Sequence, residues 1–261
     1  MRKNVLIFYM GLLFYSCFFV SSVFPAELSE DIEEEETPAE ISQEKKSALL
    51  EVSVTSTSGN SETASIITGA DFFYGASGNS IDFNGNMYYG ENSRMLNLRI
   101  VEGRVKGAHD FNIHNYGYLL GILKHDEFQR LNLRSSLGMG YGYRFFKDPY
   151  EELSFEVGIG LQGEDFAGAR KDDYYHEGRI GVNYIYKLSK TAHFITRDEY
   201  LPSLSDISNS RIRGEFKLVE SLYKNLVIML NLIVDYDNSP VDSSVKNLDT
   251  RLFAGVGYSF F

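Results

Sequence analysis

The sequence has no tryptophan, one cysteine and five prolines among its 261 residues. The lone Cys17 lies in the first apolar segment, so the rest of the chain offers no thiol for a disulfide or a thiolate metal site. Basic residues are also scarce, because 25 lysines and arginines stand against 36 aspartates and glutamates, a net charge of −11. This acidity argues against nucleic acid as a partner, since phosphates require a basic surface. The mildly negative mean hydropathy argues against a polytopic helical membrane protein.

Aromatic residues and glycine are abundant instead, with 19 phenylalanines, 18 tyrosines and 23 glycines. This mixture is typical of strands with tight bends rather than of a helical bundle. A chain of this length has room for one large domain or two small ones. Composition therefore favours an all-β body and leaves its architecture open.

The first 26 residues have the order of a secretory signal peptide. Arg2 and Lys3 precede the apolar run 5–20, and small residues follow up to Ala26. A charged start, a short apolar core and small residues are the features of such signals. We predict a signal peptide over 1–26, cleaved after Ser22 or Ala26. Two alternatives are a permanent membrane helix over 5–24, which is long enough to span, and a lipidated Cys17.

Residues 27–47 form a strongly acidic segment. It has nine acidic residues and two lysines, a local charge of −7, and few apolar side chains. Self-repulsion without apolar burial predicts a disordered periplasmic tether. The alternative is an arm that binds cations or contacts the cell wall.

From residue 48 onward, apolar and polar residues alternate with period two. In 131–146, for example, one face carries Leu137, Met139 and Tyr141, while the other carries Gly138, Gly140 and Gly142. A helix would instead need apolar spacings of three and four. We predict about twelve strands, at 48–57, 63–74, 80–89, 94–106, 111–125, 130–146, 152–165, 174–188, 192–203, 209–222, 226–237 and 248–260.

The connections between these strands alternate in length. Turns at 75–79, 107–110, 147–151, 189–191 and 223–225 are short on average, while the opposite set includes 166–173, 204–208 and 238–247. An even strand number with short turns at one end and longer loops at the other is typical of transmembrane barrels. The predicted fold is an all-β, antiparallel, up-and-down β-barrel of about twelve strands over 48–261, placed in the bacterial outer membrane.

Alternation by itself does not say which face of the barrel is outside. A soluble sandwich or a cup that binds an apolar ligand would put the oily face inward. Strand length, aromatic residues near strand ends and glycines on the polar face favour the transmembrane reading. We therefore predict a lumen lined by the charged residues Arg134, Arg144, Glu156, Arg179, Lys187, Arg213, Glu215, Lys217 and Asp235.

The chain ends on an apolar strand. Gly255, Tyr258 and Phe260 have the spacing of the C-terminal insertion signal of outer-membrane barrels, although Phe253 and the extra Phe261 depart from it. This pattern predicts that the last strand engages the barrel assembly machinery. Outer-membrane lipid and lipopolysaccharide are the other expected partners.

Several short motifs carry a family resemblance over residues 49–260. They are the hairpin 57–63, Tyr116-Gly117-Tyr118 leading to 138–143, the stretch 201–206, and 237–240 ahead of Asp249-Thr250. Together they resemble the bacterial outer-membrane family of unknown function often called salt-induced outer membrane protein. The resemblance implies an outer-membrane barrel and supplies no catalytic residues.

No residue pattern indicates an enzyme or a cofactor. The five histidines, His109, His114, His125, His176 and His193, lack metal-binding spacings, and Gly-x-Ser-x-Gly is absent. Acidic pairs at 172–173 and at Asp235 with Asp237 are alternative cation sites near the rim. We predict a structural barrel or a narrow channel for ions and small solutes, with no cofactor. A membrane-embedded lipid hydrolase and a soluble apolar-ligand barrel remain the alternatives.

Overall fold

The computed structural model describes residues 44–57, 63–92, 95–127, 129–167, 173–240 and 246–260. The predicted signal peptide, most of the acidic segment and the hairpin loop 58–62 lie outside these residues. Twelve strands account for almost all of the described chain. They are β1 (Lys45–Thr57), β2 (Thr63–Ala76), β3 (Asn79–Asn92), β4 (Met95–Asp110), β5 (Asn115–Asp126), β6 (Leu131–Lys147), β7 (Glu151–Phe166), β8 (Asp173–Lys187), β9 (Ala192–Pro202), β10 (Ser210–Tyr223), β11 (Leu226–Asp237) and β12 (Leu248–Phe260).

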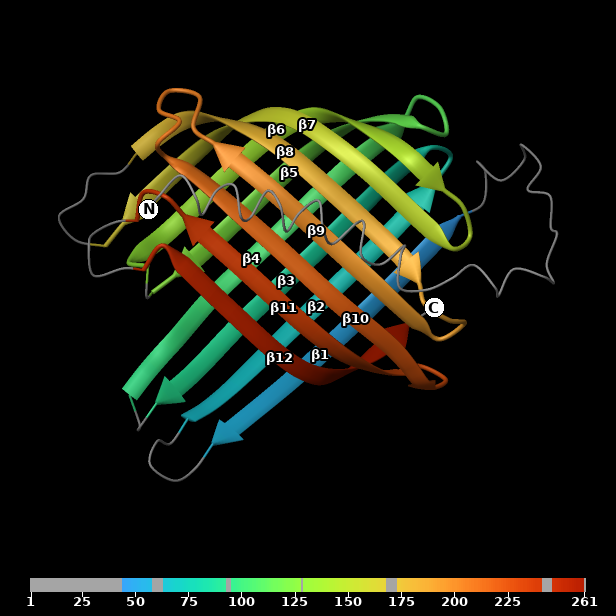
Figure 1. Cartoon of the computed structure of the whole chain (residues 1–261), viewed down its shortest axis with the longest axis horizontal. Helices are drawn as coiled ribbons and strands as arrows, with labels where there is room; N and C mark the ends of the chain where they lie inside the picture. Colours follow the sequence, from blue (N-terminus) through green and yellow to red (C-terminus); the bar gives the residue numbers. More distant parts are fainter. Residues whose placement is uncertain are drawn as a thin grey trace. The chain divides into compact units, whose positions relative to one another are not determined.

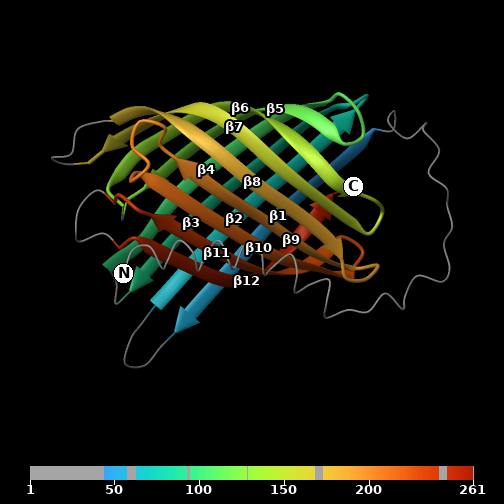
Figure 2. The ribbon, with the colours of Figure 1, turned by 45° about the horizontal axis from the view of Figure 1, so that its top comes forward.

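The strands form one closed antiparallel barrel. Each strand pairs with its neighbours in sequence, and β1 pairs with β12 from Ala48 opposite Phe260 to Val52 opposite Val256. Figures 1 and 2 show the blue first strand and the red last strand meeting to close the sheet. Closure removes the open edges that a membrane cannot hydrate. The predicted fold class and strand number are confirmed.

The two ends of the barrel differ in their connections. One end, here called the turn end, has connections of two to four residues between β2 and β3, β4 and β5, β6 and β7, β8 and β9, and β10 and β11. The other, the loop end, has the longer connections, including 203–209 and 238–247. At the tightest turn, Ser77 and Gly78 both have positive φ angles, 49° and 75°. Two such residues form a turn whose twist matches that of the flanking strands.

Several strand boundaries differ from the prediction, among them the end of β3, which is Asn92 where residue 89 was expected. β1 begins at Lys45, three residues before the expected start. The turn predicted at 107–110 is wrong, because β4 continues to Asp110 and the chain turns at 111–114 instead. The Asn112 side chain makes this turn, since its Oδ1 accepts hydrogen bonds from the backbone N–H groups of His114 (3.0 Å) and Asn115 (2.9 Å).

Bulges interrupt the alternation at both ends of β6. The register shifts between Leu131 and Leu133 and again between Arg144 and Phe146. Leu131, predicted to face outward with Leu133, is therefore fully buried, and Phe146 is exposed beside Phe145. A bulge adds one residue to a strand and so moves the following side chains to the other face.

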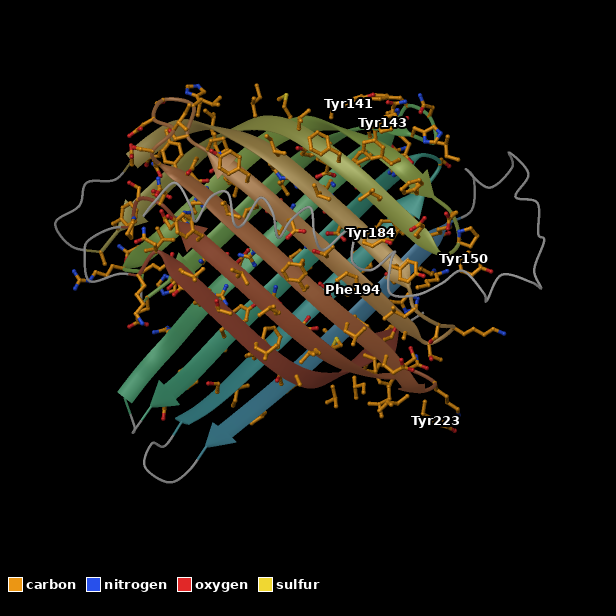
Figure 3. The ribbon with its side chains drawn as sticks, viewed as in Figure 1. Tyr141, Tyr143, Tyr150, Tyr184, Phe194 and Tyr223 are labelled. Carbon is orange, nitrogen blue, oxygen red and sulfur yellow. The ribbon has the colours of Figure 1, made fainter. Side chains whose placement is uncertain are left out.

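The outer surface of the barrel is apolar. Large exposed apolar side chains occur on every strand except β9, among them Leu50, Ile66, Val101, Leu137, Ile159 and Leu252. Aromatic residues gather toward the turn end, where Figure 3 labels Tyr141, Tyr143, Tyr150, Tyr184, Phe194 and Tyr223. An apolar band with an aromatic girdle is the exterior of a transmembrane barrel. Within the described ranges, no helix is long and apolar enough to cross a membrane.

Candidate lumen and its constriction

Ion pairs between strands that are not neighbours show which side chains point inward. Arg104 on β4 donates to Glu199 on β9 through both terminal nitrogens, at 3.0 and 2.8 Å. Arg213 on β10 reaches Glu102 on β4 at 2.9 Å. In the closed strand order, β4 lies five strands from β9 and six from β10. These contacts therefore cross the lumen, and the charged face is the inner one.

A dry network fills one half of the lumen, between β4 and β9. We call Arg104, Lys106, Glu156, Arg179 and Glu199 the cross-lumen network. Arg179 joins its two carboxylates, donating to Glu156 Oε2 at 2.7 Å and to Glu199 Oε1 at 2.8 Å, and Lys106 also pairs with Glu156. The Glu156 and Glu199 side chains are 0% and 2% exposed. Buried charges persist only when paired and hydrogen-bonded in this way.

Two tyrosines of β5 support this network from the barrel wall. Tyr116 donates its hydroxyl to Glu156 Oε1 at 2.6 Å, and the Tyr118 hydroxyl accepts from Arg179 Nη1 at 2.7 Å. Their rings lie against inward glycines of β6 and β7, because a Cβ at Gly158 would come within 2.5 Å of the Tyr118 hydroxyl. These glycines therefore make room for the tyrosine rings.

An apolar cluster occupies the opposite side of the lumen. It consists of the buried inward residues Ile67, Tyr88, Ile100, Ile233 and Phe253. Tyr88 packs edge-on against Phe253, with ring centroids 6.0 Å apart, and the Arg251 guanidinium lies 5.0 Å from its ring centre. The Tyr88 hydroxyl is buried and has no hydrogen-bond partner among the described residues. An oily inner cluster was not expected from the sequence.

A less buried file of charges, the β10–β11 track, runs between these two fillings. It consists of Lys217, Glu215, Arg213 and Asp235, whose side chains are 21%, 23%, 13% and 17% exposed. Arg213 is the least exposed member and the one that bridges the lumen to Glu102. It also donates to Glu215 at 2.7 Å and lies 3.6 Å from Asp235. We therefore place the constriction of the lumen at Arg213, which spans it to Glu102, and at the buried Tyr88.

Further ion pairs lie inside the barrel toward its loop end and toward its turn end. Toward the loop end, Arg134 donates to Glu164 at 2.7 Å and lies 3.6 Å from Asp237 on β11, five strands away. At the turn end, Arg144 donates to Asp110 at 2.9 Å. Most of the inner charges described here are thus paired, from the loop end to the turn end.

The structure brings eight of the nine predicted lumen charges into these contacts. Lys187 differs, because it lies exposed at the turn end of β8. The C-terminal residues separate by face: Tyr258 and Phe260 are exposed outward with ring centroids 4.8 Å apart, and Gly255 faces inward against the Val52 backbone.

Important inner charges were missed in the sequence, namely Glu102, Arg104, Lys106, Arg197 and Glu199. Alternation on β4 could have found the first three, because Glu102, Arg104 and Lys106 oppose Val101, Gly103 and Val105. On β9 the signal was obscured. Thr196 and Asp198, on the other face of that strand, are polar as well.

The alternative sites, a serine–histidine hydrolase site and an acidic cation site, are not assembled in the described part of the chain. The three histidine hydrogen bonds there go to the Asn79 side chain and to the backbone oxygens of Arg144 and Asn132, and none goes to a serine. The Asp235 and Asp237 carboxylates pair with arginines, and no group of three metal-binding side chains occurs among the described residues. The expectation of no enzymatic activity and no cofactor stays a prediction.

Comparison with known proteins gives a family match and a shared fold. A family model described as "Protein of unknown function, DUF481" matches residues 50–260. No curated protein sequence matches the chain. Among solved structures, the NanC porin shares 10% identity with a TM-score of 0.52, covering 82% of this chain and 100% of that chain.

Two further structures are more distant. The KdgM porin shares 13% identity with a TM-score of 0.40, covering 83% of this chain and 100% of its own. The translocator domain of autotransporter NalP from Neisseria meningitidis shares 12% identity with a TM-score of 0.42, covering 83% and 88%. The likeness to the NanC porin shows the barrel fold alone, because an identity of 10% is too low to carry an activity.

Proposed function

Because the chain belongs to DUF481, a family of unknown function, its role has to come from its own residues, and we propose that it is a narrow outer-membrane channel for small ions. The family match agrees with the resemblance noted in the sequence, while the name "salt-induced" stays untested. The β10–β11 track carries the proposal. A file of partly buried charges beside the buried cross-lumen network and the apolar cluster offers water one polar route through the barrel.

The constriction explains why this channel would be narrow. A barrel of twelve strands lies between eight-stranded barrels filled by side chains and porins of 16–18 strands with an aqueous pore. Here the cross-lumen network and the apolar cluster fill most of that intermediate lumen. Only ions and very small solutes then fit past Arg213. A passing ion can replace one of the carboxylate partners of Arg213, so that its passage costs little free energy.

Replacing Arg213 by alanine tests the route. We expect single-channel conductance in planar bilayers to rise at least about twofold, because the substitution removes the side chain that bridges the narrowest level. The matched control is Arg99→Ala. Arg99 lies at the loop end of β4, forms an exposed pair with Glu127 at 3.3 Å, and touches no part of the track.

The control should leave conductance unchanged. Silence of the purified wild-type protein at all voltages would reject the channel while sparing the barrel. Equal conductance of Arg213→Ala and the wild type would show that ions do not pass along the β10–β11 track.

We further propose that the protein resides in the outer membrane, surrounded by lipid and lipopolysaccharide, and reaches it through the barrel assembly machinery. The apolar exterior and the aromatic girdle support this location. Tyr258 and Phe260 support the assembly step, because both rings stand exposed on the outer face of the closing strand.

Replacement of Phe260 by alanine should slow assembly. We expect a severalfold lower yield of heat-modifiable barrel in membrane fractions, because the outward ring recognised on the last strand is lost. Phe72→Ala is the matched control, since Phe72 is a similarly exposed outward ring of β2, 41% against 38% for Phe260. Equal yields of the two variants would contradict a signal specific to the last strand.

A further inference from the structure

We infer that the channel prefers small cations over anions, and that β3 supplies the selective surface. This inference deepens the proposed channel and rests on it.

The inner face of β3 is a row of oxygen-bearing side chains. Ser80, Asp82, Asn84 and Asn86 alternate along the strand toward Tyr88, and each is half-buried. The Asn86 amide donates to Asn84 Oδ1 at 2.8 Å, and the Asn84 amide donates to Asp71 Oδ1. These bonds use one N–H of each amide, and the Asn86 amide oxygen and the Asp82 carboxylate accept no hydrogen bond from another described residue. β3 contains no lysine, arginine or histidine.

Asp82 is the one acid of β3 that faces the lumen. It forms no hydrogen bond or salt bridge with any other described residue. Its register partner on β4 is Lys106, whose ammonium pairs with Glu156 of the cross-lumen network instead. Arg197, the cation within electrostatic reach of Asp82, pairs with Glu215 at 3.5 Å. The charge of Asp82 is therefore poorly compensated.

Carboxylates also outnumber cations around the track as a whole. Lys217 is shared by two acids, Glu51 at 3.0 Å and Asp71 at 3.1 Å. Arg251 pairs with Asp235, which also lies beside Arg213. The groups bordering the route are six carboxylates, Glu51, Asp71, Asp82, Glu102, Glu215 and Asp235, and four cations, Arg197, Arg213, Lys217 and Arg251.

An excess of negative charge in a narrow, low-dielectric tube concentrates cations and repels anions. The oxygen atoms of β3 add the ligands that hard cations such as potassium, magnesium and calcium prefer. A cation can therefore exchange part of its hydration shell along β3, where the Asp82 carboxylate repels a chloride ion. The geometry points to cation selectivity on the turn-end side of the constriction.

Reversal potentials in a potassium chloride gradient across planar bilayers test this sign. Wild-type protein should give a potassium-to-chloride permeability ratio above one. Asp82→Asn should lower that ratio about threefold, the effect of one charge acting through water over roughly 6 Å. Lys217→Gln should change it in the opposite direction, because Glu51 and Asp71 lose their shared cation.

Glu91→Gln is the matched control on the same strand. Glu91 accepts a hydrogen bond from the exposed Tyr89 hydroxyl on the outer face, at 2.6 Å, so the net charge changes equally but outside the lumen. Its permeability ratio should equal the wild-type value. A current that prefers chloride, or an Asp82→Asn ratio equal to the wild type, would overturn this inference and spare the channel. The absence of any current would overturn both.

Discussion

Replacing Glu199 by glutamine should destabilise the barrel more than any other single charge removal. Glu199 is 2% exposed and accepts hydrogen bonds from Arg104 and Arg179, which lie on strands far apart in the barrel. The substitution leaves the buried Arg104 guanidinium without its carboxylate, and Arg179 keeps only Glu156. Breaking a buried pair in this way costs about 3–5 kcal/mol. Urea unfolding from lipid vesicles should show this loss as a lower midpoint.

An exposed ion pair of similar chemistry provides the comparison. Glu127 accepts from Arg99 at 3.3 Å at the loop end, where both side chains are about half exposed. Such pairs contribute about 0–1 kcal/mol, so Glu127→Gln should unfold close to the wild-type midpoint. Equal midpoints for the two variants would show that the cross-lumen network does not hold the barrel together.

Replacing Gly140 by alanine should have the second largest effect. A Cβ at this position would collide with the Val157 carbonyl oxygen and the Tyr118 hydroxyl and lie 2.5 Å from Tyr118 Cζ. The carbonyl belongs to the neighbouring strand and cannot move away cheaply. Overpacking of this kind costs about 1–3 kcal/mol. Displacement of Tyr118 also removes the hydrogen bond that its hydroxyl accepts from Arg179.

Gly121→Ala separates this clash from the general effect of losing a strand glycine. Gly121 lies on β5 and faces outward, and a Cβ there would have no atom within 4 Å. Both substitutions restrict the unfolded chain equally, so their difference reports the inner contact alone. Gly121→Ala should stay within about 0.5 kcal/mol of the wild type. A similar loss in both variants would contradict the fit of Tyr118 against Gly140.

The fold could be predicted almost completely from local patterns. Period-two alternation located all twelve strands, because successive side chains of a barrel strand face the lipid and the lumen in turn. The errors occurred where the period breaks. The bulge at Leu131 turned an expected lipid-facing residue inward, and the Asn112 side chain moved a turn by four residues. Neither event changes the amino-acid pattern enough to be visible in a single sequence.

The sequence predicted that charged side chains line the lumen, but it did not predict which of them form ion pairs. Alternation placed Arg134, Arg179 and Arg213 on the polar face, but a strand pattern contains no information about the opposite wall. Glu199 and Arg104 are 95 residues apart and five strands apart in the closed barrel. Such a pair exists only after closure has brought β4 and β9 across from each other.

By itself, then, the sequence determined the number of strands, their alternation and the oily exterior, because each follows from the side-chain order within one strand. The tertiary structure alone decided how the lumen is filled: which charges meet, where Tyr88 and Phe253 pack, and where Arg213 leaves a narrow polar route. The physical reason is the range of the interactions. Strand alternation is set by neighbouring residues, whereas the lumen is set by contacts between walls that closure of the barrel places opposite one another.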